Sequence, residues 1–294
     1  MGRRGTVSIH FSLGLGNNIF QYVFGRLIAE LHNMKLRHPA IPEFGIEARK
    51  NRPFTGYPTK TIKVKLKIPD TQYHKFLDRA PNKKNYYLYG FFEDYTLYKP
   101  HLERIRSWFP QVEKTNTNDL VLHMRLGNRL VQRKSLMSQV SPRQYANVIK
   151  SFDFDKLYIV TDTSKSYWRP LTKDDVNMMK RQRRKKYKNN AVMAPIEHTM
   201  KYMDDLVSTL SQFEPIIVHH KDHMKDFNFI RSFDKMIIHN STFSWWAATL
   251  SHASRVGVYK PWKPAKGKKN KNLGRTDFPG WFGWGTDDRA NYWK

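Results

Sequence analysis

Hydroxyl and amide side chains gather in one short stretch, between an apolar run and a helical pattern. They belong to Asn240, Ser241, Thr242 and Ser244. The apolar run 236–238 predicts a buried strand, and residues 243–251 predict a helix that Ser241 or Thr242 would cap. Such a helix start presents unpaired backbone N–H groups and the positive end of the helix dipole, which favour phosphate. The alternative is an ordinary capped helix with Trp245 and Trp246 in the core.

A histidine and an arginine stand two residues apart near the end of a second predicted strand, 120–126. Side chains two apart on a strand share a face, so His123 and Arg125 are expected to point the same way. Open α/β sheets bind ligands at the carboxyl ends of their strands, and a guanidinium makes paired hydrogen bonds to phosphate oxygens. We therefore predict catalytic roles for both residues. The alternative is a core histidine and a surface ion-pair arginine.

A glycine loop at 12–18 separates the first predicted strand, 6–11, from a predicted helix at 19–34. Gly14, Gly16 and Asn17 lie in this loop. It lacks the third glycine and the distant acidic residue of a dinucleotide fingerprint, and Asn17 suits a helix start better than a pyrophosphate contact. Glycines nevertheless let the backbone approach a ligand closely, so these residues are predicted to line the donor site.

An acidic side chain, Asp162, follows the predicted strand 157–160. A carboxylate there can accept two hydrogen bonds from the N1 and N2 donors of guanine, or it can cap the next helix.

Metal ligands are hard to assemble from this sequence. The adjacent acid pairs, including Glu93-Asp94, do not form an Asp-x-Asp after a strand, and His219-His220 and His223 lack an evident third ligand. With 52 lysines and arginines, phosphate charge can be neutralised by side chains instead. We expect no metal and no cofactor.

The remaining elements alternate between strands and helices, which predicts the α/β class with a parallel sheet covered on both faces. Predicted helices lie at 97–108, 142–149 and 200–212, and further strands at 62–68 and 215–218. The rest of 35–85 is expected to be irregular, and 114–119 is expected to be a linker.

Charge and composition narrow the class of partner. The chain has 294 residues, no cysteine and a formal charge of +27, which favours anionic partners and rules out disulfides and thiolate zinc sites. The basic run 180–188 is interpreted as a solvated loop. No apolar segment approaches the roughly 18 residues of a membrane span, so we expect a soluble or cytoplasmic protein or a domain of a longer chain.

Taken together, the segments resemble the α-1,2-fucosyltransferases of glycosyltransferase family 11. The stretch 14–26, GLGNNIFQYVFGR, is similar to that family's G-L-G-N-Q-M-F-Q-Y-A-x-G-R, and 240–250 is similar to its N-S-T-F-S-W-W-A-A-x-L. Weaker similarities follow in family order at 90–95, at 123–128, and at 160–163 with Trp168. The matches cover most of the chain, from residue 12 to about residue 262.

The resemblance implies a GT-B-type fold, with two Rossmann-like domains facing a cleft. It places an acceptor-side domain at 1–115, a nucleotide-sugar domain at 116–260 and a tail at 261–294 that packs back on the body. It also implies metal-independent, inverting transfer of L-fucose from GDP-β-L-fucose to a glycan hydroxyl, in an α-1,2 linkage. Arg125 would bind the β-phosphate and Asp162 the guanine, while Ser241, Thr242 and Ser244 would bind the pyrophosphate.

Two departures from the family motifs leave the general base open. Asn128 replaces an Asp, and Thr163 replaces the second Asp of an F-S-D-D segment. By location, the candidate bases are His123, His10, Glu93 and Asp94, with the last two preferred. A dissociative reaction without a strong base would rely on Arg125 to stabilise the departing pyrophosphate.

Two other functions remain open from the sequence alone. The same fold could use another nucleotide sugar, as in a xylosyl- or rhamnosyltransferase. A basic protein could instead bind nucleic acid or another polyanion, but no known nucleic-acid module occurs, so we expect no sequence-specific nucleic-acid partner. The basic patches are expected to favour an acidic membrane surface or the acceptor.

Overall fold

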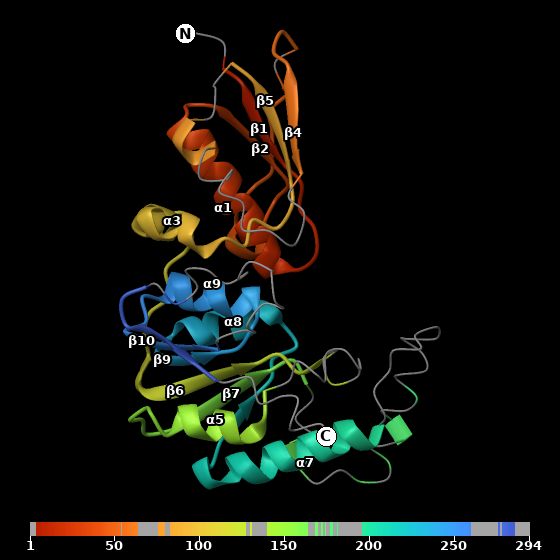
Figure 1. The fold of residues 1–294 in the computed structure, drawn as a ribbon, viewed down its shortest axis with the longest axis vertical. Helices are drawn as coiled ribbons and strands as arrows, with labels where there is room; N and C mark the ends of the chain where they lie inside the picture. Colours follow the sequence, from red (N-terminus) through yellow and green to blue (C-terminus); the bar gives the residue numbers. More distant parts are fainter. Residues whose placement is uncertain are drawn as a thin grey trace, which may run out of the picture. The chain divides into compact units, whose positions relative to one another are not determined.

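The computed structural model describes most of the chain. The described residues are 4–53, 55–63, 76–79, 83–127, 130, 140–163, 168–169, 172, 174, 177–178, 181, 196–259, 276 and 278–285. By internal contacts they divide into two units (Figure 1). The first runs up to Gln111, and the second begins at Val112 and also takes in the residues from Pro279.

The first unit contains a five-stranded sheet in the order β3-β2-β1-β5-β4. Its strands are β1 (Thr6–Ile9), β2 (Lys35–His38), β3 (Arg49–Lys50), β4 (Thr59–Lys63) and β5 (Asn85–Tyr89). Its helices are α1 (Leu15–Leu31), α3 (Leu102–Arg106) and the short 3-10 turns η1 (Pro42–Phe44), η2 (Tyr95–Leu97) and η3 (Lys99–His101). Every strand pair is parallel except β2 with the edge strand β3.

Helix α1 packs tightly on this sheet because its apolar residues recur at helical spacing and because Gly25 faces β1. A Cβ atom built at Gly25 would lie 2.4 Å from Cδ1 of Ile9. Ile19, Val23 and Leu27 are fully buried in this layer. The family-like glycine therefore sets how closely helix and sheet approach.

The second unit holds a six-stranded sheet in the order β11-β10-β9-β6-β7-β8, and all of its strand pairs are parallel. Its strands are β6 (Asn116–Met124), β7 (Leu157–Thr161), β8 (Ile216–Val218), β9 (Phe233–Ile238), β10 (Arg255–Tyr259) and β11 (Trp281–Trp284). Its helices are α5 (Pro142–Ile149), α7 (Ile196–Leu210), α8 (His223–Arg231), α9 (Thr242–Ser251) and the 3-10 turn η6 (Ser211–Phe213).

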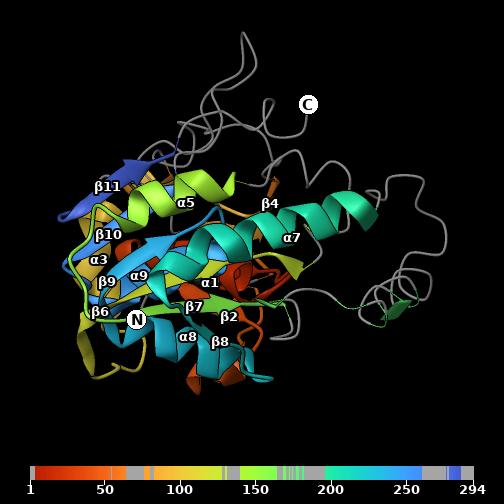
Figure 2. The ribbon, with the colours of Figure 1, turned by 90° about the horizontal axis from the view of Figure 1, so that it is seen from below.

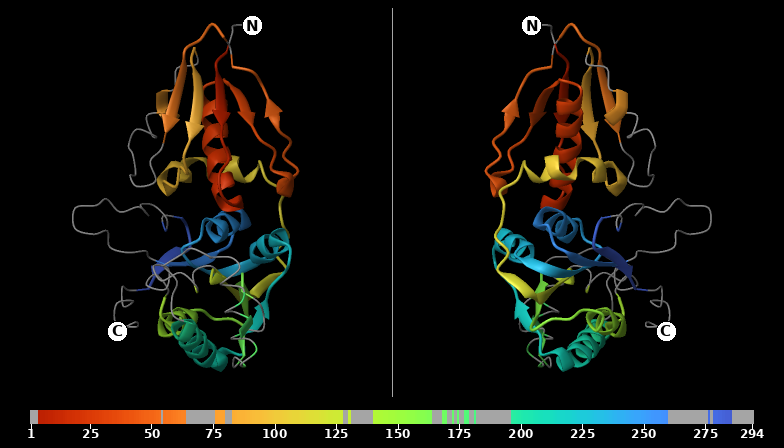
Figure 3. Two further views of the ribbon diagram at one scale, coloured as in Figure 1. Left: turned by 90° about the vertical axis from the view of Figure 1, so that its right-hand side faces the viewer. Right: turned by 90° about the vertical axis from the view of Figure 1, so that its left-hand side faces the viewer.

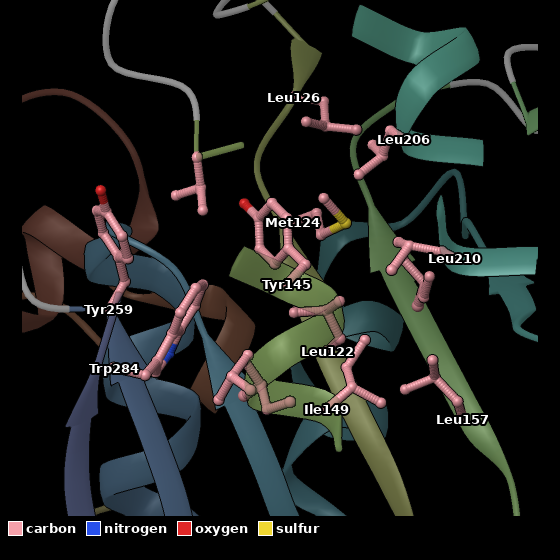
Figure 4. Packing of buried hydrophobic residues seen from close by; sticks show 14 of the residues in the cluster. Leu122, Met124, Leu126, Tyr145, Ile149, Leu157, Leu206, Leu210, Tyr259 and Trp284 are labelled. Carbon is pink, nitrogen blue, oxygen red and sulfur yellow. The ribbon is translucent and has the colours of Figure 1, made fainter. Parts of the chain in front are cut away.

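Helices cover both faces of this second sheet. Helices α8 and α9 (cyan and blue) lie on one face, and α5 and α7 (green and teal) lie on the other (Figures 2 and 3). Figure 4 shows the core on the α5 and α7 side, where Leu122, Ile149, Leu157 and Leu206 belong to one buried hydrophobic cluster. The predicted α/β class with mostly parallel sheets is therefore confirmed.

Several predicted boundaries were wrong in the first unit. Helix α1 begins four residues earlier than expected, because Gly14 is its N-cap and the N–H groups of Asn17 and Asn18 already donate to the Gly14 carbonyl. Hydrophobic spacing cannot detect such a polar first turn. The helix expected at 97–108 is interrupted: it is divided between the 3-10 turns η2 and η3 and the five-residue helix α3.

The region 35–85 was expected to be irregular, but β2, β3 and β4 all join the first sheet. Their short, lysine-rich sequences do not show the apolar alternation of a typical strand. Strands β5 and β10 and helix α8 also escaped prediction. The basic run 180–188 and most of the predicted strand 62–68 lie outside the described residues. Among the helices that the structure describes, none is both long and apolar enough to cross a bilayer.

Candidate functional site

The carboxyl edge of the second sheet brings together residues that are far apart in the sequence. On β6, His123 lies beside Ile238 of β9 and beside Val160 of β7. Arg125, Asn240 and Asp162 each lie two residues beyond one of these three paired residues, His123, Ile238 and Val160. Because neighbouring strands lie about 4.8 Å apart, Arg125, Asn240 and Asp162 leave the sheet at one level and from adjacent strands.

The start of α9 carries a buried serine hydroxyl that does not cap the helix. Ser241 is the N-cap residue in extended conformation, but its side chain caps no backbone N–H. Its side chain is only 3% exposed, and its hydroxyl makes no hydrogen bond to any residue that the structure describes. A buried polar group left unpaired costs about 1–3 kcal/mol, so this hydroxyl is a candidate for ligand binding.

The other members of this stretch divide into two kinds. Asn240 is exposed and Thr242 is half-buried, so both belong to the accessible edge. Ser244 is fully buried and donates to the Ser241 carbonyl at 3.3 Å, so it stabilises the helix start. Trp245 and Trp246 are fully buried with their ring centroids 4.9 Å apart, which makes them core residues.

Asp162 holds the chain just beyond Arg125. Its Oδ1 accepts hydrogen bonds from the backbone N–H of Leu126 at 2.7 Å and of Gly127 at 2.8 Å. A Cβ atom at position 127 would lie 2.4 Å from Oδ2 of Asp162, so any larger residue there would displace the carboxylate. Asp162 thus positions the Arg125 loop, a role that neither sequence alternative included. Arg125 itself is exposed, and guanine recognition by Asp162 stays a prediction.

His123 does not share the exposure of Arg125. It is 6% exposed, and its ring packs against that of Phe243 on α9 with centroids 5.6 Å apart. Strand β6 ends at Met124, so the expected alternation of faces does not carry His123 and Arg125 to a common surface. Its burial fits the core-histidine alternative, and its catalytic role stays a prediction.

The glycine loop of the first unit is arranged by a residue that sequence reasoning missed. Gln21 is fully buried; its Oε1 accepts from the Ser12 N–H at 3.0 Å, and its Nε2 donates to Ser12 Oγ and to the Gly90 carbonyl at 2.8 Å. A glutamine on the buried face of an apolar helix is the sequence signal that could have revealed it. The loop is therefore fixed from within the first unit.

Among the predicted donor residues in that loop, Gly14 is exposed, and a Cβ there would meet no atom within 4 Å. Gly16 is buried in the first turn of α1, and the Asn17 N–H donates to the Gly14 carbonyl at 2.9 Å. These positions shape a helix start, and their donor role stays a prediction.

The preferred base candidates lie at the end of β5. Asp94 caps η2, because its Oδ1 accepts from the Thr96 N–H at 3.1 Å and from the Thr96 hydroxyl at 2.5 Å. Burial, and then the charges of Asp94 and Glu93, hold the pKa of the Tyr98 phenol well above its usual value. Asp94 therefore has a capping role, while Glu93 is half-buried beside it. His10 is exposed and stacks on Tyr89, with ring centroids 5.2 Å apart.

One departure from the family motifs has a structural explanation. Thr163 is 4% exposed, its hydroxyl lies 2.9 Å from that of Thr161, and it accepts from Trp168 Nε1 at 3.3 Å. A threonine there completes an internal hydrogen-bond group. Asn128 lies outside the described residues.

Two histidines extend the same sheet edge beyond β8. His219 Nδ1 lies 2.9 Å from the Thr161 carbonyl, and His220 Nδ1 lies 2.6 Å from Oδ1 of Asp226. The sequence analysis considered these histidines only as metal ligands. Their position directly after a strand was the sequence signal that could have placed them at this sheet edge. Within the described part of the chain, no three His, Cys, Asp or Glu side chains form a group that could hold a metal ion.

Comparisons with known proteins give a similarity to solved structures only. No family model matches the chain, and no curated protein matches it either. The chain is similar to the structure of a mutant of FUT1 from Arabidopsis thaliana in complex with GDP. The match has a TM-score of 0.42 and 11% sequence identity, and it covers 88% of this chain and 71% of the other. Similarity at this level does not identify an activity.

Proposed function

We propose that the chain is a glycosyltransferase that moves a sugar, L-fucose by the motif resemblance, from a GDP-sugar to a hydroxyl of a glycan. The observation that carries this proposal is the buried Ser241 hydroxyl at the start of α9, which has no partner among the described residues and follows the strand next to β6, the strand that precedes Arg125. The same segment, 240–250, has the strongest similarity to glycosyltransferase family 11.

In this proposal the donor diphosphate lies against the α9 N-terminus. The backbone N–H groups of its first turn, together with the Ser241 and Thr242 hydroxyls, donate to phosphate oxygens in this arrangement. Arg125 adds a fork of N–H donors to the β-phosphate, which lysine could not replace. Asp162 keeps the Arg125 loop in place through two backbone hydrogen bonds, and guanine contact through its other oxygen is a further part of the proposal.

The proposed reaction breaks the bond between C1 of the sugar and the β-phosphate oxygen. The acceptor hydroxyl oxygen forms the new bond to C1 from the opposite side, and its proton passes to a base or to water. The electron pair of the broken bond leaves with GDP, and Arg125 stabilises the charge that develops on the phosphate. Asp94 caps η2 and His123 is buried, so we propose Glu93 as the base, on residue type and its half-buried position.

We also propose that the reaction needs no metal ion. The chain carries 52 basic residues against 25 acidic ones, so guanidinium and ammonium groups can neutralise the diphosphate. Candidate partners are thus a GDP-sugar and a glycan.

A donor-hydrolysis screen tests this function. The purified chain is incubated in chelator with GDP-fucose, GDP-mannose, UDP-xylose and a deoxythymidine diphosphate sugar, and the released nucleotide is measured. GDP release from GDP-fucose, lost in Arg125→Ala and kept in the exposed control Arg143→Ala, is expected. Release from a uridine or thymidine donor would assign another sugar, and cleavage of no donor would contradict a transferase.

A further inference from the structure

A polar pocket lies in the first unit, between the C-terminal half of α1 and the β2–β3 edge of the sheet. Its volume is about 280 Å³, near the lower end of small-molecule sites. The polar side chains that line it are Arg26, Glu30, Asn33, Lys35, Arg49 and Asn51. The predicted donor residues do not line it, so it is separate from the proposed donor site.

The pocket has three cationic side chains and one carboxylate. Glu30 already pairs with Arg26, with Oε1 2.7 Å from Nε. Among the described residues, no carboxylate forms an ion pair with Lys35 or Arg49. With Glu30 paired to Arg26, the lining therefore carries an excess of positive charge.

Arg26 is held rigidly at the wall of this pocket. Its Nη1 donates to the Tyr22 hydroxyl at 2.7 Å, and its guanidinium carbon lies 4.3 Å from the centre of the Trp108 ring. Stacking and two side-chain bonds fix the plane of the guanidinium before any ligand arrives. A fixed guanidinium loses little entropy on binding an oxyanion.

The positive charge around the pocket contributes to the lowered pKa of a neighbouring histidine, His38. Burial lowers the pKa of His38; a hydrogen bond to the Pro39 carbonyl opposes this, and the charges of Arg49 and Arg26 lower the pKa further. Arg49 lies directly across from His38 in the β2–β3 pair, and Arg37 lies across from Lys50. Like charges placed opposite each other on paired strands destabilise a sheet, so the Arg37–Lys50 pair adds positive charge to this edge at a cost in stability.

Asparagine side chains complete the lining with neutral hydrogen-bonding groups. Asn51 is fixed by donating Nδ2–H to the Leu36 carbonyl at 2.8 Å, and Asn33 adopts a left-handed conformation with φ 52° at the end of α1. Cations and amides together suit a sugar that bears an acidic group. A bare anion would leave the amides unused.

We propose that this pocket binds the carboxylate, sulfate or phosphate group of an anionic glycan. The binding itself is a property of the first unit, and it is measured without a donor. The excess positive charge of the chain then favours approach of the same class of ligand.

The test is a calorimetric titration of the full chain with four probes: a sulfated disaccharide, a glucuronate disaccharide, a neutral disaccharide and inorganic sulfate. The wild type is compared with Arg49→Gln, Lys35→Gln and a matched control, Arg104→Gln, an exposed arginine on α3. Thermal melting confirms that each variant is folded, and GDP binding is measured on the same samples.

We expect both anionic disaccharides to bind, with about tenfold weaker binding in Arg49→Gln and Lys35→Gln and no change in Arg104→Gln. GDP binding should be unchanged in all three variants. Equal binding by Arg49→Gln and Arg104→Gln would overturn the proposal, as would equal binding of the neutral disaccharide. Sulfate that binds as tightly as the sulfated disaccharide, or single-stranded RNA that competes better than either glycan, would also overturn it. Loss of GDP binding alone would count against the proposed function and leave the pocket standing.

Discussion

The β1–α1 connection of the first unit and the β9–α9 connection of the second have the same plan: a buried strand, a short loop and a helix. Both carry the most specific family-like motifs of the chain. In the first, the Gln21 amide bonds inside the unit and Gly25 permits close packing. In the second, the Ser241 hydroxyl is buried without a partner among the described residues. One motif stabilises a fold, while the other leaves a polar group for a ligand.

The largest expected effect tests the second connection. Arg125→Ala should lower turnover about 100-fold or more, because a charge-assisted contact to the leaving group is lost. The melting temperature should hardly change, since Arg125 is exposed beyond the end of β6. Arg125→Lys should also be impaired. Full activity of the alanine variant would remove Arg125 from the reaction.

The next effect tests the first connection as a structural motif. Gly25→Ala should destabilise the chain by about 1–2 kcal/mol, because overpacking against Ile9 exceeds the gain in helix propensity. Gly14→Ala is the matched control, since its Cβ would meet no atom within 4 Å and its φ is −89°. Denaturant melts of both variants measure the difference. Equal stabilities would show that α1 is not held by close packing at Gly25.

Asp162 decides between a loop anchor and a guanine contact. Asp162→Ala should lower stability by about 1–2 kcal/mol and weaken GDP binding, because two backbone N–H groups lose their acceptor. Asp162→Asn keeps an acceptor oxygen and should retain most GDP binding if the anchor role dominates. The competing outcome, in which Asp162→Asn binds GDP and ADP equally well, would assign guanine recognition to this residue.

The smallest effect on stability is expected from Asp234, near the start of β9 and away from the end that leads to α9. Burial alone would raise the pKa of Asp234, but hydrogen bonds from Lys114 and Ser254 outweigh it and lower the pKa. This stabilisation is present above the unfolded pKa and is lost as pH falls through the folded value. Asp234→Asn should therefore lower the free energy of unfolding by about 0.5–1 kcal/mol at pH 7. The variant should also lose less stability than the wild type as the pH is lowered. An unchanged loss of stability in urea melts between pH 2 and pH 6 would refute this.

The sequence could predict the elements that follow simple periodicity. The core helices α5 and α7 and strands β7 and β8 were expected within a few residues, because apolar spacing decides them. Strands β2 and β3 were missed because lysines and arginines dominate these short segments, and the pairing of β2 with β1 and of β3 with β2 compensates for a weak local pattern. Local propensity does not register such tertiary pairing.

The candidate site was predictable by position and less so by role. Residues at strand ends, such as Arg125 and Asp162, do meet at one sheet edge. Their tasks depend on hydrogen bonds across 35 or 36 residues, as between Asp162 and the Arg125 loop, and no local pattern shows these. Hydrogen bonding likewise distinguishes Ser241 from Ser244, two hydroxyls that look equivalent in the sequence.

The most direct test of a GDP-sugar seat at the start of α9 is a calorimetric titration of GDP into the chelator-treated chain, beside Arg125→Ala. The account predicts binding without metal by the wild type and at least tenfold weaker binding by the variant. GDP at about 100 times its dissociation constant should then stabilise the fold by roughly 2.7 kcal/mol. GDP binding that requires added Mg²⁺ or Mn²⁺, or that is unaffected by loss of the Arg125 guanidinium, would contradict it.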